Sequence, residues 1–188
     1  MKVVLLGNTR VGKTSMLARL TNGVFKEDTS ATIGAAFQTH VISSDSGCIT
    51  MQIWDTAGQE KYRALAPMYY RSANVAVLCF DLTNRESFQS LELWVEELVE
   101  KGPSNLITVL VGTKLDLVES RVISSEEAES FASRNSMAFY GECSAKTGIG
   151  VNNIFTKIAE INESNLDDIS VKKIKPEQPQ SNEKSKCC

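Results

Sequence analysis

No stretch of the sequence approaches the roughly 20 consecutive apolar residues that a membrane-spanning helix needs, so we expect no such helix. The formal net charge of −3 lacks the basic excess that would draw the chain to nucleic acid or to anionic lipid. Met1 and Lys2 begin neither a secretory signal nor a myristoylation site. The single histidine, His40, shows no catalytic partner, and we interpret it as a strand residue. The composition, with 42% hydrophobic and 23% charged residues among 188, predicts one globular domain.

The five cysteines are unevenly spaced. Cys48, Cys79 and Cys143 stand singly in apolar surroundings, whereas Cys187 and Cys188 are adjacent at the end of the sequence. This spacing fits neither a disulfide framework nor a zinc site. We therefore expect the protein to work in a reducing compartment.

The segment 7–14, Gly-Asn-Thr-Arg-Val-Gly-Lys-Thr, matches the phosphate-loop pattern G-x-x-x-x-G-K-[ST]. An apolar run precedes it at 3–6 and a helical pattern follows at 15–20, which is the strand–loop–helix context that the motif requires. Backbone N–H groups of such a loop and of the new helix bind anions. Lys13 would reach the outer phosphates and the Thr14 hydroxyl would ligate Mg²⁺. We expect nucleotide contacts from Asn8, Thr9, Arg10, Val11, Gly12, Lys13, Thr14 and Ser15.

Farther along, a polar segment without clear period predicts a mobile loop over 24–34. The turn signal 45–47 predicts an antiparallel hairpin of strands 37–43 and 48–54. Apolar runs then alternate with amphipathic helices, two of which begin at capping boxes; strands are expected at 75–80, 106–111 and 137–140, capping boxes at 83–86 and 124–127, and a last helix at 151–161. The pattern predicts a three-layer α/β fold with a six-stranded, mostly parallel sheet, one antiparallel edge strand and five helices.

Ligands of such sheets bind beyond the carboxyl ends of the strands, and the polar segment that follows 48–54 begins at that edge of the sheet. Asp55 directly follows Trp54 and can hold Mg²⁺ through a water, as in other phosphate-loop enzymes. Gly58 can offer its N–H to a terminal phosphate, and Gln59 can orient the attacking water. Alone, Asp55 could equally cap a strand, but its place after a phosphate loop favours the metal.

Base selection is predicted farther along, where Thr113-Lys114-Leu115-Asp116 follows a buried strand. A carboxylate at Asp116 can accept hydrogen bonds from N1–H and the 2-amino group of guanine, whereas adenine offers neither donor. Ser144, Ala145 and Lys146 follow the last strand and would supply a backbone N–H to guanine O6, and Phe25 could contact the base from the far side. Each motif is weak alone. Their order and their position at strand ends make the combination specific.

These motifs resemble the small GTPases of the Ras superfamily over residues 1–163. The match is to the Rab family, through Ile33-Gly34-Ala35-Ala36-Phe37, Trp54-Asp55-Thr56-Ala57-Gly58-Gln59-Glu60 and Tyr69-Tyr70-Arg71. The segment 65–70 together with Ala35-Ala36 resembles the early-endosomal subgroup. The resemblance implies a phosphate-loop G domain that hydrolyses GTP to GDP, slowly without an activating protein, and works as a switch in vesicular transport.

The resemblance also implies individual roles. Thr32 would ligate Mg²⁺ and meet the γ-phosphate only in the GTP state, and the loops around Thr32 and Gln59 would be the two switches. Effectors would bind an apolar patch made of Ile33, Phe37, Trp54 and Tyr69. The same apolar residues could instead form hydrophobic core between the hairpin and the second switch. An exchange factor, a GTPase-activating protein and an escort or GDI-type chaperone are the other implied partners.

The segment 164–188 is polar, contains two prolines and predicts a flexible tail. Its final Cys187-Cys188 pair resembles the Rab signal for double prenylation. Two lipid chains anchor stably where one holds only marginally. The resemblance therefore implies a place on the cytoplasmic face of membranes, in the endosomal system, with cycling through the cytosol.

Three positions depart from the Rab pattern. Thr113 stands where asparagine is usual, and it lacks the amide that bridges the base and the phosphate loop. The Rho family resembles this segment with threonine at the same place, so we expect guanine binding to survive. The β-branched Thr9 would crowd the γ-phosphate, and Arg10 would screen phosphate charge from outside. Our hypothesis is slow intrinsic hydrolysis with Gln59 still competent.

Two other functions fit part of the pattern. A small-molecule phosphotransferase would also use a phosphate loop, but it needs an arginine-rich lid, and the sequence has no such insertion. A GTP-binding module with little hydrolysis is harder to separate from the leading hypothesis. Following bound GTP to GDP on the purified chain distinguishes all three.

Overall fold

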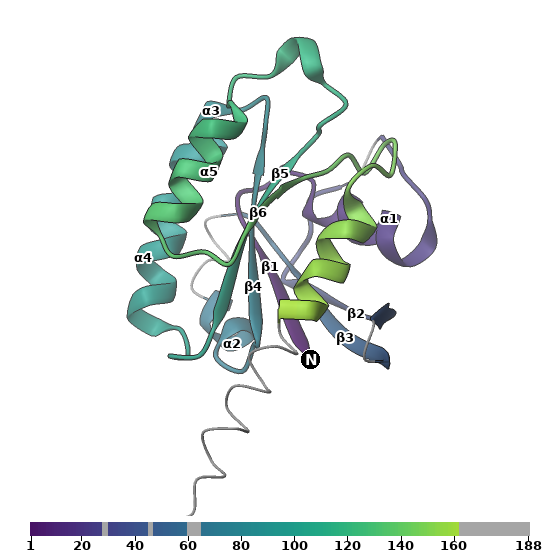
Figure 1. Cartoon of the computed structure of the whole chain (residues 1–188), viewed down its shortest axis with the longest axis vertical. Helices are drawn as coiled ribbons and strands as arrows, with labels where there is room; N and C mark the ends of the chain where they lie inside the picture. Colours follow the sequence, from purple (N-terminus) through teal and green to yellow (C-terminus); the bar gives the residue numbers. More distant parts are fainter. Residues whose placement is uncertain (28–29, 45–46, 60–64, 162–188) are drawn as a thin grey trace, which may run out of the picture.

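The computed structural model describes residues 1–27, 30–44, 47–59 and 65–161. They form one six-stranded sheet in the order β2-β3-β1-β4-β5-β6, between two layers of helices (Figure 1). The hairpin strands β2 and β3 pair antiparallel and the other pairs are parallel, as predicted. The strands are β1 (Lys2–Leu6), β2 (Ala35–Ser44), β3 (Gly47–Thr56), β4 (Val75–Asp81), β5 (Ile107–Thr113) and β6 (Tyr140–Glu142).

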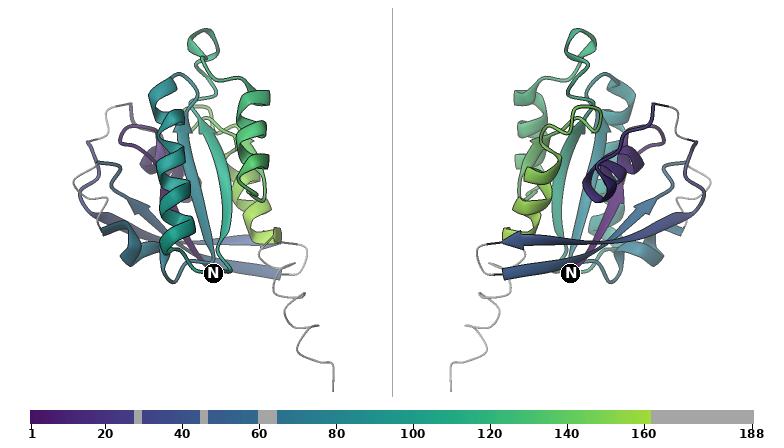
Figure 2. Two further views of the ribbon diagram at one scale, coloured as in Figure 1. Left: turned by 90° about the vertical axis from the view of Figure 1, so that its left-hand side faces the viewer. Right: turned by 90° about the vertical axis from the view of Figure 1, so that its right-hand side faces the viewer.

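Helices cover both faces of the sheet, as the two flank views in Figure 2 show. One face carries α1 (Lys13–Asn22) and the helical residues 151–161. The other face carries α2 (Ala66–Tyr70), α3 (Arg85–Gln89), α4 (Leu91–Lys101) and α5 (Ser125–Arg134). Within the described part of the chain, no helix has the length and apolar character to cross a membrane.

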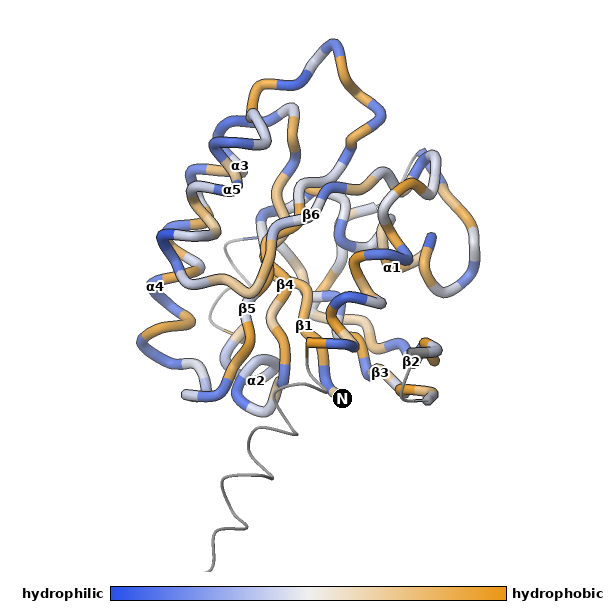
Figure 3. The backbone as a smooth tube through the Cα atoms, in the orientation of Figure 1, coloured by the Kyte–Doolittle hydropathy of each residue, from blue (hydrophilic) through white to orange (hydrophobic). Residues whose placement is uncertain are grey.

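Strand β1 shows why the sheet needs helices on both sides. Successive side chains of a strand point to opposite faces, so Val3 and Leu5 join one core while Val4 and Leu6 join the other. All four side chains are fully buried. The central strands β1, β4 and β5 accordingly consist mainly of hydrophobic residues (Figure 3). This rigid centre holds the loops that leave the carboxyl ends of its strands.

The structure corrects several predicted boundaries. Both hairpin strands are longer than the hydrophobic pattern indicated, and the last strand is Tyr140–Glu142, not 137–140. The short helix α2 has too few residues to show a helical period, and the pattern did not locate it. The single helix expected after residue 83 is divided at Ser90 into α3 and α4, while its apolar stripe still faces the core.

The capping residue of α3 is also corrected. The predicted box placed Thr83 at the cap, but Asn84 is the N-cap, and its side-chain oxygen accepts from the Ser87 N–H at 3.0 Å. Thr83 turns back and donates to the Asp81 carboxylate instead. In the second box Ser124 does cap α5, accepting from the Glu127 N–H at 3.2 Å.

Replacing Asn84 with alanine should lower the free energy of unfolding by about 1 kcal/mol, since it removes that acceptor. Asn84→Asp is the matched control, because it keeps an acceptor and adds a negative charge at a helix N-terminus. Urea unfolding at one fixed nucleotide concentration compares the three proteins. Equal stability of native protein and Asn84→Ala would contradict the assignment.

Candidate nucleotide-binding site

The loop between β1 and α1 turns on two glycines with left-handed backbone. At Gly7, φ is 132°, and a Cβ there would lie 2.2 Å from the carbonyl oxygen of Cys79 in β4. Gly12, with φ 96°, is the N-cap of α1. No other residue type allows this approach and conformation without strain. The loop therefore lies tightly against β4 and leads directly into the start of α1.

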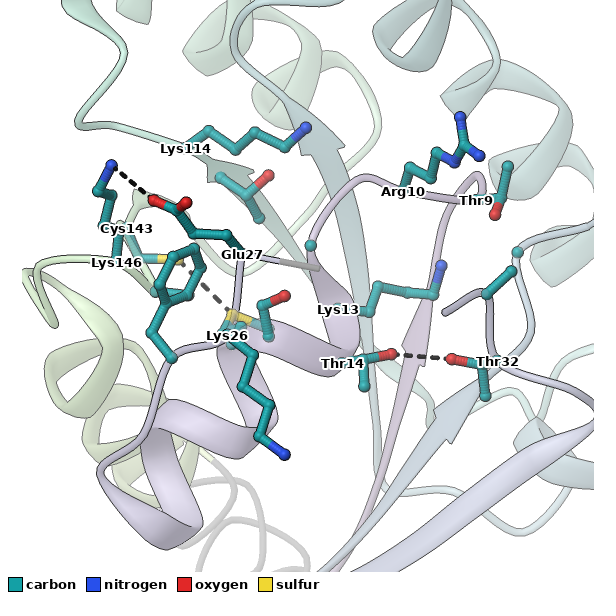
Figure 4. Close-up of a pocket in the computed structure, with 18 of the residues that line it drawn as sticks. Thr9, Arg10, Lys13, Thr14, Lys26, Glu27, Thr32, Lys114, Cys143 and Lys146 are labelled. Atoms are coloured by element: carbon teal, nitrogen blue, oxygen red, sulfur yellow. Dashed lines mark hydrogen bonds and ion pairs between the residues drawn. The ribbon is translucent and has the colours of Figure 1, made fainter. Parts of the chain in front are cut away.

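Lys13 lies inside this turn, whereas Arg10 lies on its outer side (Figure 4). The Lys13 ammonium donates to the carbonyl oxygens of Gly7 at 2.7 Å and Asn8 at 2.8 Å. Only 5% of the residue is exposed, and this burial lowers the pKa of the ammonium, against the opposing effect of Cys79 and Asp55. A buried cation held by neutral carbonyls is suited to meeting an anion that enters the loop.

Three oxygen-bearing side chains converge beside Lys13. The Thr14 hydroxyl donates to Asp55 Oδ2 at 2.6 Å and lies 2.8 Å from the Thr32 hydroxyl (Figure 4). Burial raises the pKa of the Asp55 carboxyl, and the Thr14 hydrogen bond opposes that shift. Asp55 Oδ1 is the one buried side-chain nitrogen or oxygen among the described residues that lacks a hydrogen-bond partner. Hydroxyl and carboxylate oxygens beside an unsatisfied buried acceptor fit a magnesium ion.

Gly58 holds the segment after β3 against the phosphate loop. A Cβ at Gly58 would lie 2.3 Å from the carbonyl carbon of Asn8 and 2.4 Å from the nitrogen of Thr9, so only glycine fits. The neighbouring Ala57 N–H donates to the Gly34 carbonyl at 2.7 Å, which joins this segment to the one containing Thr32. Both predicted switches thus touch the phosphate loop or each other.

The motifs predicted to read the base lie at the ends of β5 and β6. The Thr113 hydroxyl is buried and contacts the carbonyls of Val11 in the phosphate loop and Phe80 in β4. Ser144 donates to Asp116 Oδ1 at 2.6 Å and accepts from the Thr147 N–H. Thr113 therefore keeps the link to the phosphate loop without an amide, and Ser144 fixes the orientation of the Asp116 carboxylate.

Lys114 has a left-handed backbone, with φ 62°, and its ammonium lies 2.6 Å from Asp81 Oδ2. Asp81 also accepts from the N–H and hydroxyl of Thr83. This ion pair holds the Lys114 side chain along the wall of the cavity next to Asp116.

One cavity of about 720 Å³ joins the two groups of motifs. Most predicted nucleotide-binding residues line it: Thr9, Arg10, Gly12, Lys13, Thr14, Ser15, Phe25, Thr32, Gly58, Thr113, Lys114, Asp116, Ala145 and Lys146. Asn8, Val11 and Ser144 lie behind this lining and act on it through the contacts above. Asp55 lies beneath Thr14, and Gln59 follows Gly58 without lining the cavity.

Sequence reasoning missed other lining residues, notably Lys26, Glu27, Ser30 and Ala31. They belong to the segment predicted as a mobile loop, and within 24–27 and 30–34 the chain indeed lacks helix and strand. The Lys146 ammonium lies 3.4 Å from a Glu27 carboxylate oxygen (Figure 4). The place of Phe25 in the same segment was the signal that could have identified them.

The predicted apolar patch is present on the hairpin side. Phe37 and Trp54 have ring centroids 5.2 Å apart, and Trp54 and Tyr69 have centroids 5.5 Å apart. Phe37 is 49% exposed and Ile33 81% exposed, whereas Trp54 and Tyr69 are half-buried against the core under α2. The patch is thus partly core and partly surface. The predicted prenylation residues, Cys187 and Cys188, lie outside the described residues, as does the rest of the predicted tail, 164–188.

Residues 2–163 match the family model described as "Ras family". The chain belongs to the Ras family. It is 45% identical over 159 residues to Ras-related protein RABF2a of Arabidopsis thaliana, a match that covers 85% of this chain and 79% of that protein. Ras-related protein Rab5A of Oryza sativa subsp. japonica is likewise 45% identical over 159 residues, with 85% and 78% covered. The Rab resemblance predicted from the motifs is confirmed.

As a Ras-family member with Rab relatives, the chain is a Rab-like small GTPase, a GTP hydrolase that works in vesicular trafficking. The family binds GTP and GDP, and the two halves of the cavity correspond in chemistry to the two ends of such a nucleotide. The Lys13 ammonium, a cation suited to phosphate, lines one end, and the carboxylate of Asp116 lies at the other end.

Asp55→Asn should weaken Mg²⁺ binding to the GDP-loaded protein by about 10–100-fold, the usual effect of losing a group that orients metal-bound water. Titrating Mg²⁺ against GDP release measures this. The nucleotide-free protein should not lose thermal stability. The pKa of the Asp55 carboxyl is raised in the folded protein, so its ionisation lowers the free energy of unfolding. This loss of stability develops as the pH rises from the pKa of the unfolded chain through the higher pKa of the folded protein. Unchanged Mg²⁺ dependence would contradict the assignment.

Proposed function

We propose that the protein is a Mg²⁺-dependent switch whose two mobile segments sense the γ-phosphate of GTP. The observation that carries the proposal is the convergence of Thr14, Thr32 and Asp55 beside Lys13, with Gly58 against the same loop. Thr32 and Gly58 come from different segments, one before β2 and one after β3. A group at the end of a triphosphate would meet both, and its loss would release both.

At the phosphate end, Lys13 would exchange its carbonyl partners for phosphate oxygens, and the N–H groups of the loop and of α1 would surround the anion. Thr14 and Thr32 would hold Mg²⁺ directly, and Asp55 would hold it through a water. The ion would neutralise charge on the phosphates. The unsatisfied Asp55 Oδ1 supports this assignment, because a metal-bound water would supply its missing donor.

At the base end, Asp116 would accept the two guanine donors, and Ser144 supports this by holding one carboxylate oxygen. The backbone N–H of Ala145 would donate to guanine O6. The stem of Lys114 and the ring of Phe25 would cover the two sides of the base. Adenine would leave the carboxylate without a donor, which costs about 1–3 kcal/mol or more.

Gln59 would orient the attacking water. Thr9 is exposed in the cavity beside the place where the γ-phosphate would lie, and Arg10 lies outside the turn. These positions support slow intrinsic hydrolysis, on the order of 10⁻⁴ s⁻¹, with acceleration by an activating protein.

The output would be recruitment of effectors to membranes. Ile33, Phe37, Trp54 and Tyr69 would form the effector surface, whose shape depends on the segments that contact the phosphate loop. An exchange factor, an activating protein and an escort or GDI-type chaperone would regulate the cycle. We place the protein on the cytoplasmic face of endosomal membranes, anchored through prenylated Cys187 and Cys188 at the end of a tail from residue 164 and cycling with the cytosol.

Limited proteolysis of the Mg²⁺-saturated protein tests the switch. GTP should protect cleavage sites around Thr32 and Gln59 relative to GDP, because only GTP draws both segments onto the loop. Gln59→Leu should keep the protected pattern for longer, with single-turnover hydrolysis slowed about ten- to a hundredfold through loss of water positioning. Equal cleavage in GTP and GDP would leave only a nucleotide-binding module.

Thr9→Gly should accelerate single-turnover hydrolysis several-fold, since it removes a β-branched side chain next to the proposed attack path. Thr9→Ser is the matched control, which keeps the hydroxyl and removes only the methyl group. Identical rates in native protein and Thr9→Gly would remove Thr9 from the explanation of slow turnover.

A further inference from the structure

Arg19 lies in the last turn of α1 and reaches across to the loop that carries Ala145 and Lys146. Its Nε donates to the carbonyl of Ala145 at 2.6 Å, and its Nη2 donates to the carbonyl of Lys146 at 2.8 Å. Its Nη1 donates to the carbonyl of Gly23 at 2.6 Å. One guanidinium thus holds three backbone carbonyls from two segments that are far apart in the sequence.

This arrangement uses geometry that only arginine has. The guanidinium is a rigid plane with five N–H donors, and it stays charged under all ordinary conditions. Hydrogen bonds from a charged donor are stronger than those between neutral groups. The stem lies beside Gly148, where a Cβ would be 3.7 Å from the Arg19 Cδ. Arg19 as a whole is half-buried; its bond to Ala145 is partly buried, whereas its bonds to Lys146 and Gly23 are exposed to water.

The two segments held by Arg19 are the walls of the base end of the cavity. Ala145 and Lys146 line one wall, and Ala145 is the residue proposed to donate its N–H to the base. Gly23 ends α1 in a left-handed conformation with φ 67°, and the chain then runs to Phe25 and Glu27, which line the other wall. The width of this part of the cavity therefore depends on Arg19.

A second contact between the walls is weaker. The 3.4 Å ion pair between Lys146 and Glu27 joins two largely exposed side chains. Exposed pairs of this kind are screened by water and contribute little. The three bonds of Arg19 are charge-assisted and shorter, at 2.6 to 2.8 Å, and one of them is partly buried, so they form the stronger of these two connections between the walls.

We propose that Arg19 is a positioning residue that sets how long the protein retains a guanine nucleotide. It holds the loop of Ala145 and Lys146 and also holds Gly23, from which the chain runs to Phe25. The two walls are thereby kept at the spacing at which both would contact the base. The proposal deepens the function proposed for this site and rests on it. Arg19 lies six residues beyond Lys13, about 9 Å along the helix axis, so its effect should fall on the base and spare the phosphates.

The test compares Arg19→Ala, Arg19→Gln and Arg19→Lys with the native full-length protein. Dissociation of fluorescent GDP in excess Mg²⁺ should be about tenfold or more faster in the alanine and glutamine variants, as expected for lost bonds to a charged donor. Arg19→Lys keeps the charge but not the fork, and should fall between them and the native protein. Hydrolysis of preloaded GTP in a single turnover should stay within twofold of native.

This split separates positioning from a general loss of structure, which would lower hydrolysis together with retention. Arg134→Ala is the matched control: it removes an arginine at the end of α5, where the guanidinium lies over the Phe131 ring on the opposite face of the sheet. It should change neither rate. If Arg19→Ala does not fold, the glutamine and lysine variants carry the comparison.

Two results would overturn the proposal: GDP release within twofold of native in Arg19→Gln, or a parallel fall in hydrolysis in every Arg19 variant. Both presuppose that the native chain retains GDP. If the native chain binds guanine and adenine nucleotides equally weakly, the function proposed for the site fails first, and the two failures are therefore distinguishable.

Discussion

The hydrogen bond from the Thr14 hydroxyl to the buried Asp55 carboxylate depends on the pairing of two strands. In the parallel ladder between β1 and β3, Leu5 lies beside Asp55, so the phosphate loop that follows β1 begins level with the end of β3. The same register brings Gly58 against Asn8. A slip by one residue would turn the Asp55 side chain to the opposite face, away from Thr14. The proposed metal site and the second switch therefore depend on this register.

The central strands give the site its stiffness. Their side chains fill both cores, whereas the loops that surround the cavity make fewer apolar contacts. Densely packed strand ends and loops with fewer apolar contacts are the combination that a switch requires, because the scaffold can keep its geometry while the sensing segments change position. The buried Asp55 charge and the left-handed residues Arg10 and Lys114 are unfavourable locally, and they all lie at this edge.

Thr113 and Thr9, two of the three departures from the Rab pattern, have different structural outcomes. Thr113 uses a short hydroxyl to contact the Val11 carbonyl, so the link between base-reading and phosphate loops survives the loss of an amide. Thr9 has no comparable compensation, since it lies exposed in the cavity. Under the proposed function, guanine binding and hydrolysis can thus diverge in this chain, because different residues would contact the two ends of the nucleotide.

The sequence by itself determined the fold class, the phosphate loop and the guanine motifs, because each rests on local pattern: apolar runs, glycine spacing, and polar residues directly after strands. Tertiary structure alone decided which distant groups meet. Nothing local in Arg19 indicates that it holds Ala145, 126 residues away, and nothing local in Thr113 indicates that its hydroxyl contacts the carbonyl of Val11, 102 residues away. Such contacts follow from strand register and helix placement, which short-range pattern does not encode.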